Sequence, residues 1–180
     1  GIISDEIIHE MFKELNDFLH GRNMAEVEMV KDYPAMSKKA ADLIIAQLRK
    51  KPASVLCFAA GKTPLGTYAR LVRACKRGTA DFSQATFIQL DEYLCAGEGD
   101  SFAHILGKHL LGKVNFRPEN IFLFNRAARN VGAECRRFDS LVKKKGIDFL
   151  LLGIGENGHI AFNEPGTGFG SNAHALKISA

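Results

Sequence analysis

The sequence lacks both a long apolar stretch and a basic leader. Its longest apolar runs, residues 55–60 and 149–152, are far shorter than the roughly 20 residues that a membrane-spanning helix needs. Residues 1–6 include two acids and no basic cluster ahead of an apolar core, so we expect no signal peptide. The expectations are therefore no membrane partner and a cytoplasmic location.

Paired metal or disulfide motifs are also missing. The four cysteines, at positions 57, 75, 95 and 135, are widely spaced and form no CxxC pair. Such spacing is typical neither of a disulfide framework nor of a zinc site, so we expect reduced thiols. The HExxH and GxSxG motifs are absent, which favours chemistry without a metal ion and without a serine nucleophile.

Charge of one sign is not concentrated anywhere in the chain. The 24 Lys and Arg residues exceed the 20 Asp and Glu residues by only four, and acids accompany the bases throughout. Nucleic acid is therefore not an expected partner, whereas small anions remain candidates. A hydrophobic fraction of 46% over 180 residues is sufficient for one globular domain.

Apolar periodicity predicts alternating helices and strands. Helices are expected over residues 1–20, 33–50, 65–75, 101–111 and 130–145. Strands are expected over residues 26–30, 54–59, 85–90, 121–124 and 147–152. No repeat or linker interrupts this order, so we predict a single α/β domain with a doubly wound, mostly parallel sheet and helices on both faces. In such folds ligands bind beyond the carboxyl ends of the strands.

The first loop at such an end contains Gly61, Lys62, Thr63 and Pro64. A glycine before a helix whose first residue is Pro64, with Thr63 able to cap it, is typical of an anion site at a helix N-terminus. A Walker A loop is excluded because that motif needs a glycine where Leu56 stands. A tight turn without a ligand is the alternative.

The second loop carries adjacent carboxylates, Asp91 and Glu92. Adjacent strand residues point to opposite faces, so only one of the two can face a pocket directly. If that residue is Asp91, partial burial would raise its pKa and favour it as a general base. A solvated turn is the alternative.

The third loop, residues 153–166, is the most informative. Glycines at 153, 155 and 158 match a dinucleotide fingerprint, but no amphipathic helix follows and no acid occurs after Glu164, so NAD binding is not expected. The loop instead presents His159 between Asn157 and Glu164, an arrangement that suits an imidazole held by a carboxylate. A purely structural histidine is the alternative.

Together the three loops resemble the glucosamine-6-phosphate deaminase/isomerase family over residues 29–177, with GIGENGHIAFNEPG (residues 153–166) as the most specific block. The resemblance implies a Rossmann-like fold shared with ribose-5-phosphate isomerase and 6-phosphogluconolactonase. It also implies a sugar-phosphate substrate, glucosamine-6-phosphate or galactosamine-6-phosphate, that is converted to the ketose phosphate with release of ammonia. No metal or cofactor is expected, because the carbonyl of the opened sugar already acidifies the C2–H bond.

The resemblance also assigns roles to residues. Asp91 matches the base that moves a proton between C2 and C1, His159 the residue that assists ring opening, and Glu164 the carboxylate that supports it. The residues expected to bind or shape the substrate site are Gly61, Lys62, Thr63, Glu92, Gly155 and Gly158, with Glu92 in a supporting role. Asn157 stands where the family usually has aspartate, which predicts a less basic histidine and brings galactosamine-6-phosphate into consideration.

The resemblance further divides the chain. Residues 1–25 are expected to form an N-terminal helical extension, and residues 26–180 the catalytic domain, which lacks the C-terminal segment of the family. Relatives are often oligomers, so a homo-oligomer is expected. Two other functions stay open: a 6-phosphogluconolactonase-like hydrolase, and a sugar-phosphate sensor without turnover.

Overall fold

The structure is a computed structural model that describes residues 26–94, 101–168 and 170–176. The chain divides into two compact units, residues 1–33 and 34–180. In the first unit, residues 26–30 form no strand, and Met29 is 74% exposed. The predicted strand at 26–30 is therefore wrong, because alternating residues form a strand only beside a partner, and no described strand pairs with them. The helix predicted over 1–20 lies outside the described residues.

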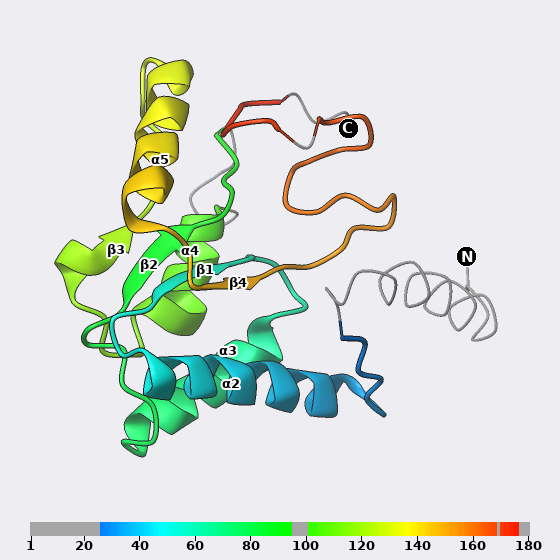
Figure 1. The fold of residues 1–180 in the computed structure, drawn as a ribbon, viewed down its shortest axis with the longest axis vertical. Coiled ribbons are helices and arrows are strands. Elements are labelled where there is room, and N and C mark those ends of the chain that lie inside the picture. Colours follow the sequence, from blue (N-terminus) through cyan, green and yellow to red (C-terminus); the bar gives the residue numbers. More distant parts are fainter. Residues whose placement is uncertain (1–25, 95–100, 169, 177–180) are drawn as a thin grey trace. The chain divides into compact units, whose positions relative to one another are not determined.

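The second unit is built on a four-stranded parallel sheet (Figure 1). Its strands are β1 (Val55–Phe58), β2 (Thr86–Gln89), β3 (Ile121–Phe122) and β4 (Phe149–Leu151), in the order β3-β2-β1-β4. Phe58 pairs with Gln89 on one side and with Leu151 on the other. The carboxyl ends of β1, β2 and β4 are therefore level, and the loops that follow them leave the same edge of the sheet.

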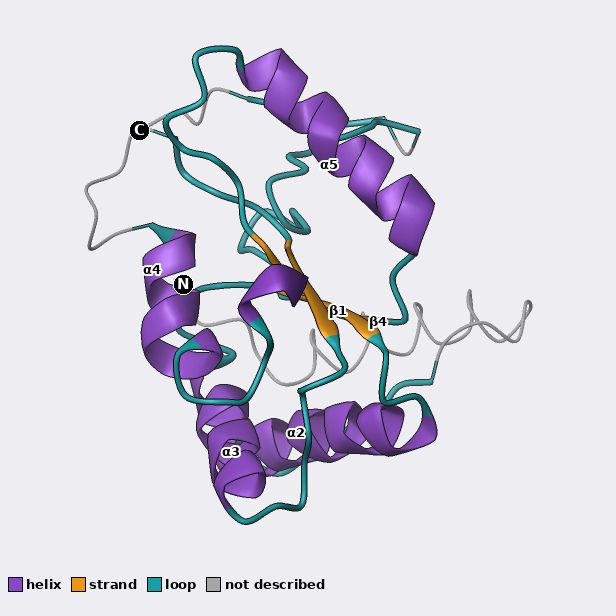
Figure 2. Cartoon of the chain, turned by 90° about the vertical axis from the view of Figure 1, so that its left-hand side faces the viewer, coloured by secondary structure: helices purple, strands orange, loops and turns teal. Residues whose placement is uncertain are grey.

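Helices cover both faces of the sheet (Figure 2). One face packs on α2 (Tyr33–Lys50), α3 (Leu65–Lys76), α4 (Phe102–Leu106) and the π-helical turn η2 (Gly107–Leu111). The other face packs on α5 (Val131–Lys145), whose Phe138 contacts Val55 and Ile88. The two apolar faces arise because alternate residues of buried strands point to opposite sides. The predicted doubly wound α/β fold is confirmed.

Element boundaries differ from the predicted ones where side chains or glycines intervene. The strand predicted over 121–124 ends at Phe122, because the Phe124 N–H donates to the side-chain Oε1 of Gln89. The helix predicted over 101–111 becomes α4 followed by η2, and the Gly112 N–H donates to the carbonyl of Gly107, five residues earlier, at 3.0 Å.

Two further features concern the described residues alone. Cys57, Cys75 and Cys135 are free thiols, and Cys57 is buried. No helix in these segments is both long enough and apolar enough to cross a bilayer.

Candidate active site

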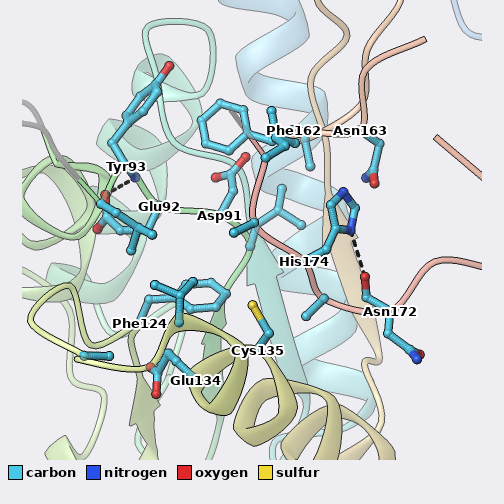
Figure 3. A pocket seen from close by; sticks show the side chains of 18 of the residues that line it. Asp91, Glu92, Tyr93, Phe124, Glu134, Cys135, Phe162, Asn163, Asn172 and His174 are labelled. Carbon is cyan, nitrogen blue, oxygen red and sulfur yellow. Dashed lines mark hydrogen bonds between the residues drawn. The ribbon is translucent and has the colours of Figure 1, made fainter. Parts of the chain in front are cut away.

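A pocket of about 560 Å³ lies at the carboxyl edge of the sheet (Figure 3). Its walls come from residues 90–94 after β2, residues 124–128 after β3, the first turns of α5, and two stretches of the C-terminal region, 161–163 and 171–176. This volume suits a small organic ligand. Asp91, which the sequence predicted as a base, and Glu92 both lie among the lining residues. The expectation that only one of them could face a pocket is wrong, because β2 ends at Gln89 and neither acid belongs to a strand.

The environment of Asp91 favours proton transfer near neutral pH. The pKa of Asp91 is raised to about 6, mainly by burial and also by the negative charge of Glu92, while His159 acts in the opposite direction. A carboxylate with such a pKa is ionised at pH 7 and is a stronger base than an exposed aspartate. The sequence expectation that partial burial would raise this pKa agrees with the structure.

Glu92 is held by hydrogen bonds on both carboxylate oxygens. Oε1 accepts from the N–H groups of Tyr93 (2.8 Å) and Phe102 (2.9 Å). Oε2 accepts from the Ala103 N–H (2.9 Å) and from Nε2 of Gln89 (3.0 Å). The sequence predicted that Glu92 lies at the substrate site in a supporting role. Its four protein donors favour that role, because they make the side chain a bridge between the end of β2 and the first turn of α4.

Two glycines shape the third loop beneath His159. The Gly155 N–H donates to the carbonyl of His159 at 2.9 Å, and the Gly158 N–H donates to the carbonyl of Gly155 at 3.0 Å. A Cβ atom on Gly155 would lie 2.3 Å from the His159 ring, and Gly158 has a φ of +84°. Both positions therefore require glycine, one for space and the other for backbone conformation.

Glu164 connects the imidazole with Asn157. Nδ1 of His159 lies 3.3 Å from Oε1 of Glu164, although the two groups are not aligned for a hydrogen bond. Oε2 of Glu164 accepts from Nδ2 of Asn157 at 2.6 Å, and Oδ1 of Asn157 accepts from the backbone N–H of His159 at 3.1 Å. Asn157 therefore acts on Glu164 and on the loop backbone, not directly on the imidazole.

Three aromatic rings join the second loop to the third. The ring of Tyr93 lies 4.8 Å from Phe102 and 4.8 Å from Phe162, and Phe102 and Phe162 are stacked at 5.6 Å. Contacts between aromatic rings stabilise the packing of the two loops by more than the burial of apolar surface alone. They fix the His159 loop beside Asp91, although His159 itself is not among the residues that line the pocket.

The first loop has the backbone that a glycine allows but lacks the expected cap. Gly61 has a φ of +119°, and the Tyr68 hydroxyl donates to the carbonyl of Ala59. Pro64 occupies the N-cap position of α3, and no side chain caps the helix, so the predictions of a capping Thr63 and of Pro64 as the first helical residue are wrong. The loop leaves the same edge as Asp91, but Gly61, Lys62 and Thr63 do not line the pocket.

Sequence analysis missed several residues of the pocket wall. Glu134 accepts hydrogen bonds from the Asn125 N–H (2.7 Å) and from Arg137 (2.6 Å to Oε1), and the bonds from Arg137 are the main reason that the Glu134 pKa is lowered. Cys135 and His174 also line the pocket. These residues reach the pocket through packing of α5 and of the C-terminal stretch, and no local motif marks them. The described residues contain no group of three His, Cys, Asp or Glu side chains placed to hold a metal ion.

Comparisons with known sequences agree with these motifs. The family described as glucosamine-6-phosphate isomerases/6-phosphogluconolactonase matches residues 31–166. The glucosamine-6-phosphate deaminase of Geobacillus sp. (strain WCH70) is 41% identical over 151 residues, which are 82% of this chain and 60% of that protein. The protein of the same name from Clostridioides difficile (strain 630) is 40% identical over 156 residues, 85% of this chain and 63% of that protein. The chain thus spans about 60% of the length of these relatives.

Solved structures show the same fold. A monomeric glucosamine-6-phosphate deaminase superposes with a TM-score of 0.82 at 35% identity, over 86% of this chain and 66% of that one. The 6-phosphogluconolactonase from Thermotoga maritima superposes with a TM-score of 0.67 at 19% identity, over 81% of this chain and 67% of that one. At that identity the second likeness concerns the fold alone.

Proposed function

Since the chain belongs to the family of glucosamine-6-phosphate isomerases and 6-phosphogluconolactonases, we propose that the protein isomerises and deaminates an amino-sugar phosphate, with glucosamine-6-phosphate as the leading substrate. Relatives with about 40% identity that carry the name glucosamine-6-phosphate deaminase support this choice. The likeness to a deaminase structure, with a TM-score of 0.82 at 35% identity, supports it as well.

Asp91 is proposed as the base. In the opened sugar the C1 aldehyde acidifies the C2–H bond, so a positioned carboxylate can take the C2 proton and return it to C1. The nitrogen at C2 is then left as an imine, which water hydrolyses to the ketone and ammonia. A pKa of about 6 keeps Asp91 ionised at neutral pH while making it basic enough to accept the proton.

His159 is proposed to move the proton that opens the sugar ring. Its Nδ1 lies 3.3 Å from Oε1 of Glu164, so this carboxylate is proposed to keep the imidazole in place. Asn157 holds the other oxygen of Glu164 and thereby orients the carboxylate. Gly61, Lys62 and Thr63 are proposed to bind the phosphate or the sugar from the first loop, where backbone N–H groups at the start of α3 favour anions.

The observation that carries the proposal is the placement of Asp91, a half-buried carboxylate with a raised pKa that lines the pocket within the electrostatic influence of His159. The test measures ammonia release from glucosamine-6-phosphate and from galactosamine-6-phosphate, using the full natural chain and its Asp91→Asn and Asp148→Asn variants. Asp148 is a matched control, because it pairs with Lys51 at the opposite edge of the sheet.

We expect the wild type to release ammonia, Asp91→Asn to release none, and Asp148→Asn to release it as the wild type does. The sugar phosphate that reacts faster identifies the substrate. If the folded wild type released no ammonia from either sugar phosphate, the proposal would be overturned, and a lactonase or a sugar-phosphate sensor would be favoured. The cytoplasmic location and the homo-oligomer expected from the sequence stay predictions, and sedimentation of the full natural chain tests the oligomer.

A further inference from the structure

Gln89, the last residue of β2, is a buried amide whose polar atoms are all engaged. Its side chain is only 2% exposed. Nε2 donates to the backbone carbonyl of Asp91 at 2.9 Å and to Oε2 of Glu92 at 3.0 Å, while Oε1 accepts from the Phe124 N–H at 2.9 Å. One side chain therefore fixes the residues after β2 and the end of β3 at the same time.

Only an amide of this length can make these three bonds. The network needs two N–H donors and one acceptor, which a glutamine supplies and which neither a carboxylate nor an aliphatic side chain supplies. Because the site is buried, a lost partner leaves polar groups without compensation. Gln89 itself does not line the pocket, so its contacts serve its neighbours and not a ligand.

We propose that Gln89 is a positioning residue, which holds Asp91 in its half-buried place through the Asp91 carbonyl and through Glu92. The part of this inference that concerns catalysis rests on the proposed function. Asp91 is anchored in two ways. Gln89 donates a hydrogen bond to the backbone carbonyl of Asp91. The next residue, Glu92, is fixed by Gln89 and by the backbone N–H groups of Tyr93, Phe102 and Ala103. Without the Gln89 amide, the segment that carries Asp91 loses the two side-chain hydrogen bonds that fix it to the end of β2.

The carboxyl of Asp91 reports on this anchoring. The charged groups that shift its pKa are Glu92 beside it and His159 from the third loop. The charge of Asp91 in turn raises the pKa values of Cys57 on β1 and Tyr68 on α3. If the anchoring is lost, the carboxyl gains access to water. Burial is the main cause of its raised pKa, so this pKa must then fall toward the ordinary aspartate value.

The first measurement follows the ¹³C resonance of the Asp91 carboxyl with pH, assigned by its loss in Asp91→Asn. The variants are Gln89→Leu, which removes all three bonds, and Gln89→Asn, which keeps the amide one methylene shorter. Gln47→Leu is the control, because Gln47 is a half-buried amide that donates to Ser54 Oγ at 3.0 Å, near the amino end of β1. Circular dichroism verifies that each variant is folded.

We expect the titration midpoint of Asp91 to fall by about one pH unit or more in Gln89→Leu and in Gln89→Asn, and to stay in place in Gln47→Leu. An unchanged midpoint in a folded Gln89 variant would overturn the inference. This measurement needs no substrate, so it decides the role of Gln89 even if the protein deaminates nothing.

The second measurement is steady-state kinetics with the sugar phosphate on which the wild type is active. A displaced base lowers kcat, whereas ground-state binding changes little. We therefore expect kcat to fall at least about tenfold with KM within about twofold in the Gln89 variants, and normal values in Gln47→Leu. Loss of thermal stability alone, with unchanged kcat and an unchanged Asp91 midpoint, would reduce Gln89 to a structural residue and refute the proposal.

Discussion

Replacing Asp91 by Asn should stabilise the fold at neutral pH while it abolishes turnover. The structure raises the pKa of this carboxyl from an ordinary value of 3.8 to about 6, mainly through burial. In the unfolded chain the group titrates near its ordinary value, so between pH 4 and pH 6 the folded state binds more protons than the unfolded state. The stability of the wild type therefore falls as pH rises through this window.

The magnitude follows from the size of the shift. Each pKa unit corresponds to about 1.4 kcal/mol, so a shift of about two units costs the fold on the order of 3 kcal/mol above pH 6. Asparagine carries no charge at any of these pH values and avoids this cost. We therefore expect the difference in unfolding free energy between Asp91→Asn and wild type to be smallest at pH 4. From pH 4 to about pH 7 this difference should grow in favour of the variant.

Urea unfolding at pH 4, 5, 6, 7 and 8 tests this reasoning, and Asp148→Asn provides a control of opposite sign. Hydrogen bonds from Lys51 and from the Val55 N–H lower the pKa of Asp148. That carboxylate stabilises the fold above its unfolded pKa, and its contribution is lost as pH falls. Asp148→Asn should therefore be less stable than wild type at pH 7. A difference between Asp91→Asn and wild type that does not grow from pH 4 to pH 7 would refute the burial of Asp91.

Three further variants test the loops. Gly155→Ala places a Cβ 2.3 Å from the His159 ring, so we expect kcat to fall on the order of 100-fold in a folded protein, as kinetics and circular dichroism can show. Asn157→Asp brings a second carboxylate to within 2.6 Å of Glu164, and the repulsion should separate Glu164 from His159 and change the pH profile of kcat; an identical profile would contradict the contact. Gly61→Ala forces a side chain into a φ of +119°, so urea unfolding should show a loss of about 1–3 kcal/mol, and an unchanged stability would contradict this backbone geometry.

The sequence predicted correctly those elements whose formation depends on their own apolar pattern. It failed for features that depend on a neighbouring segment. The core strand β1 follows directly from a continuous apolar run, all of which is buried. The helices α3 and α5 follow from apolar residues spaced three to four apart. Residues 26–30 alternate as well, but alternation does not show whether a partner strand exists. The end of β3 was also beyond local reasoning, because a side chain of β2 removes the Phe124 N–H from the ladder.

The site shows the same division between local and distant information. Asp91 and His159 stand out in the sequence because glycines, strand ends and charges surround them, and the resemblance assigned their roles. Adjacent carboxylates, however, look equivalent in a sequence, and both line the pocket. Their surroundings distinguish them: Glu92 accepts hydrogen bonds from four protein donors, whereas burial raises the pKa of Asp91. Those partners come from the end of β2 and the first turn of α4, so the division of labour between the two acids is a property of the fold. Gln89, which fixes the segment of both acids, carries no chemical signature in the sequence, because its importance lies in a side chain that joins this segment to the Phe124 N–H, 35 residues further along the chain.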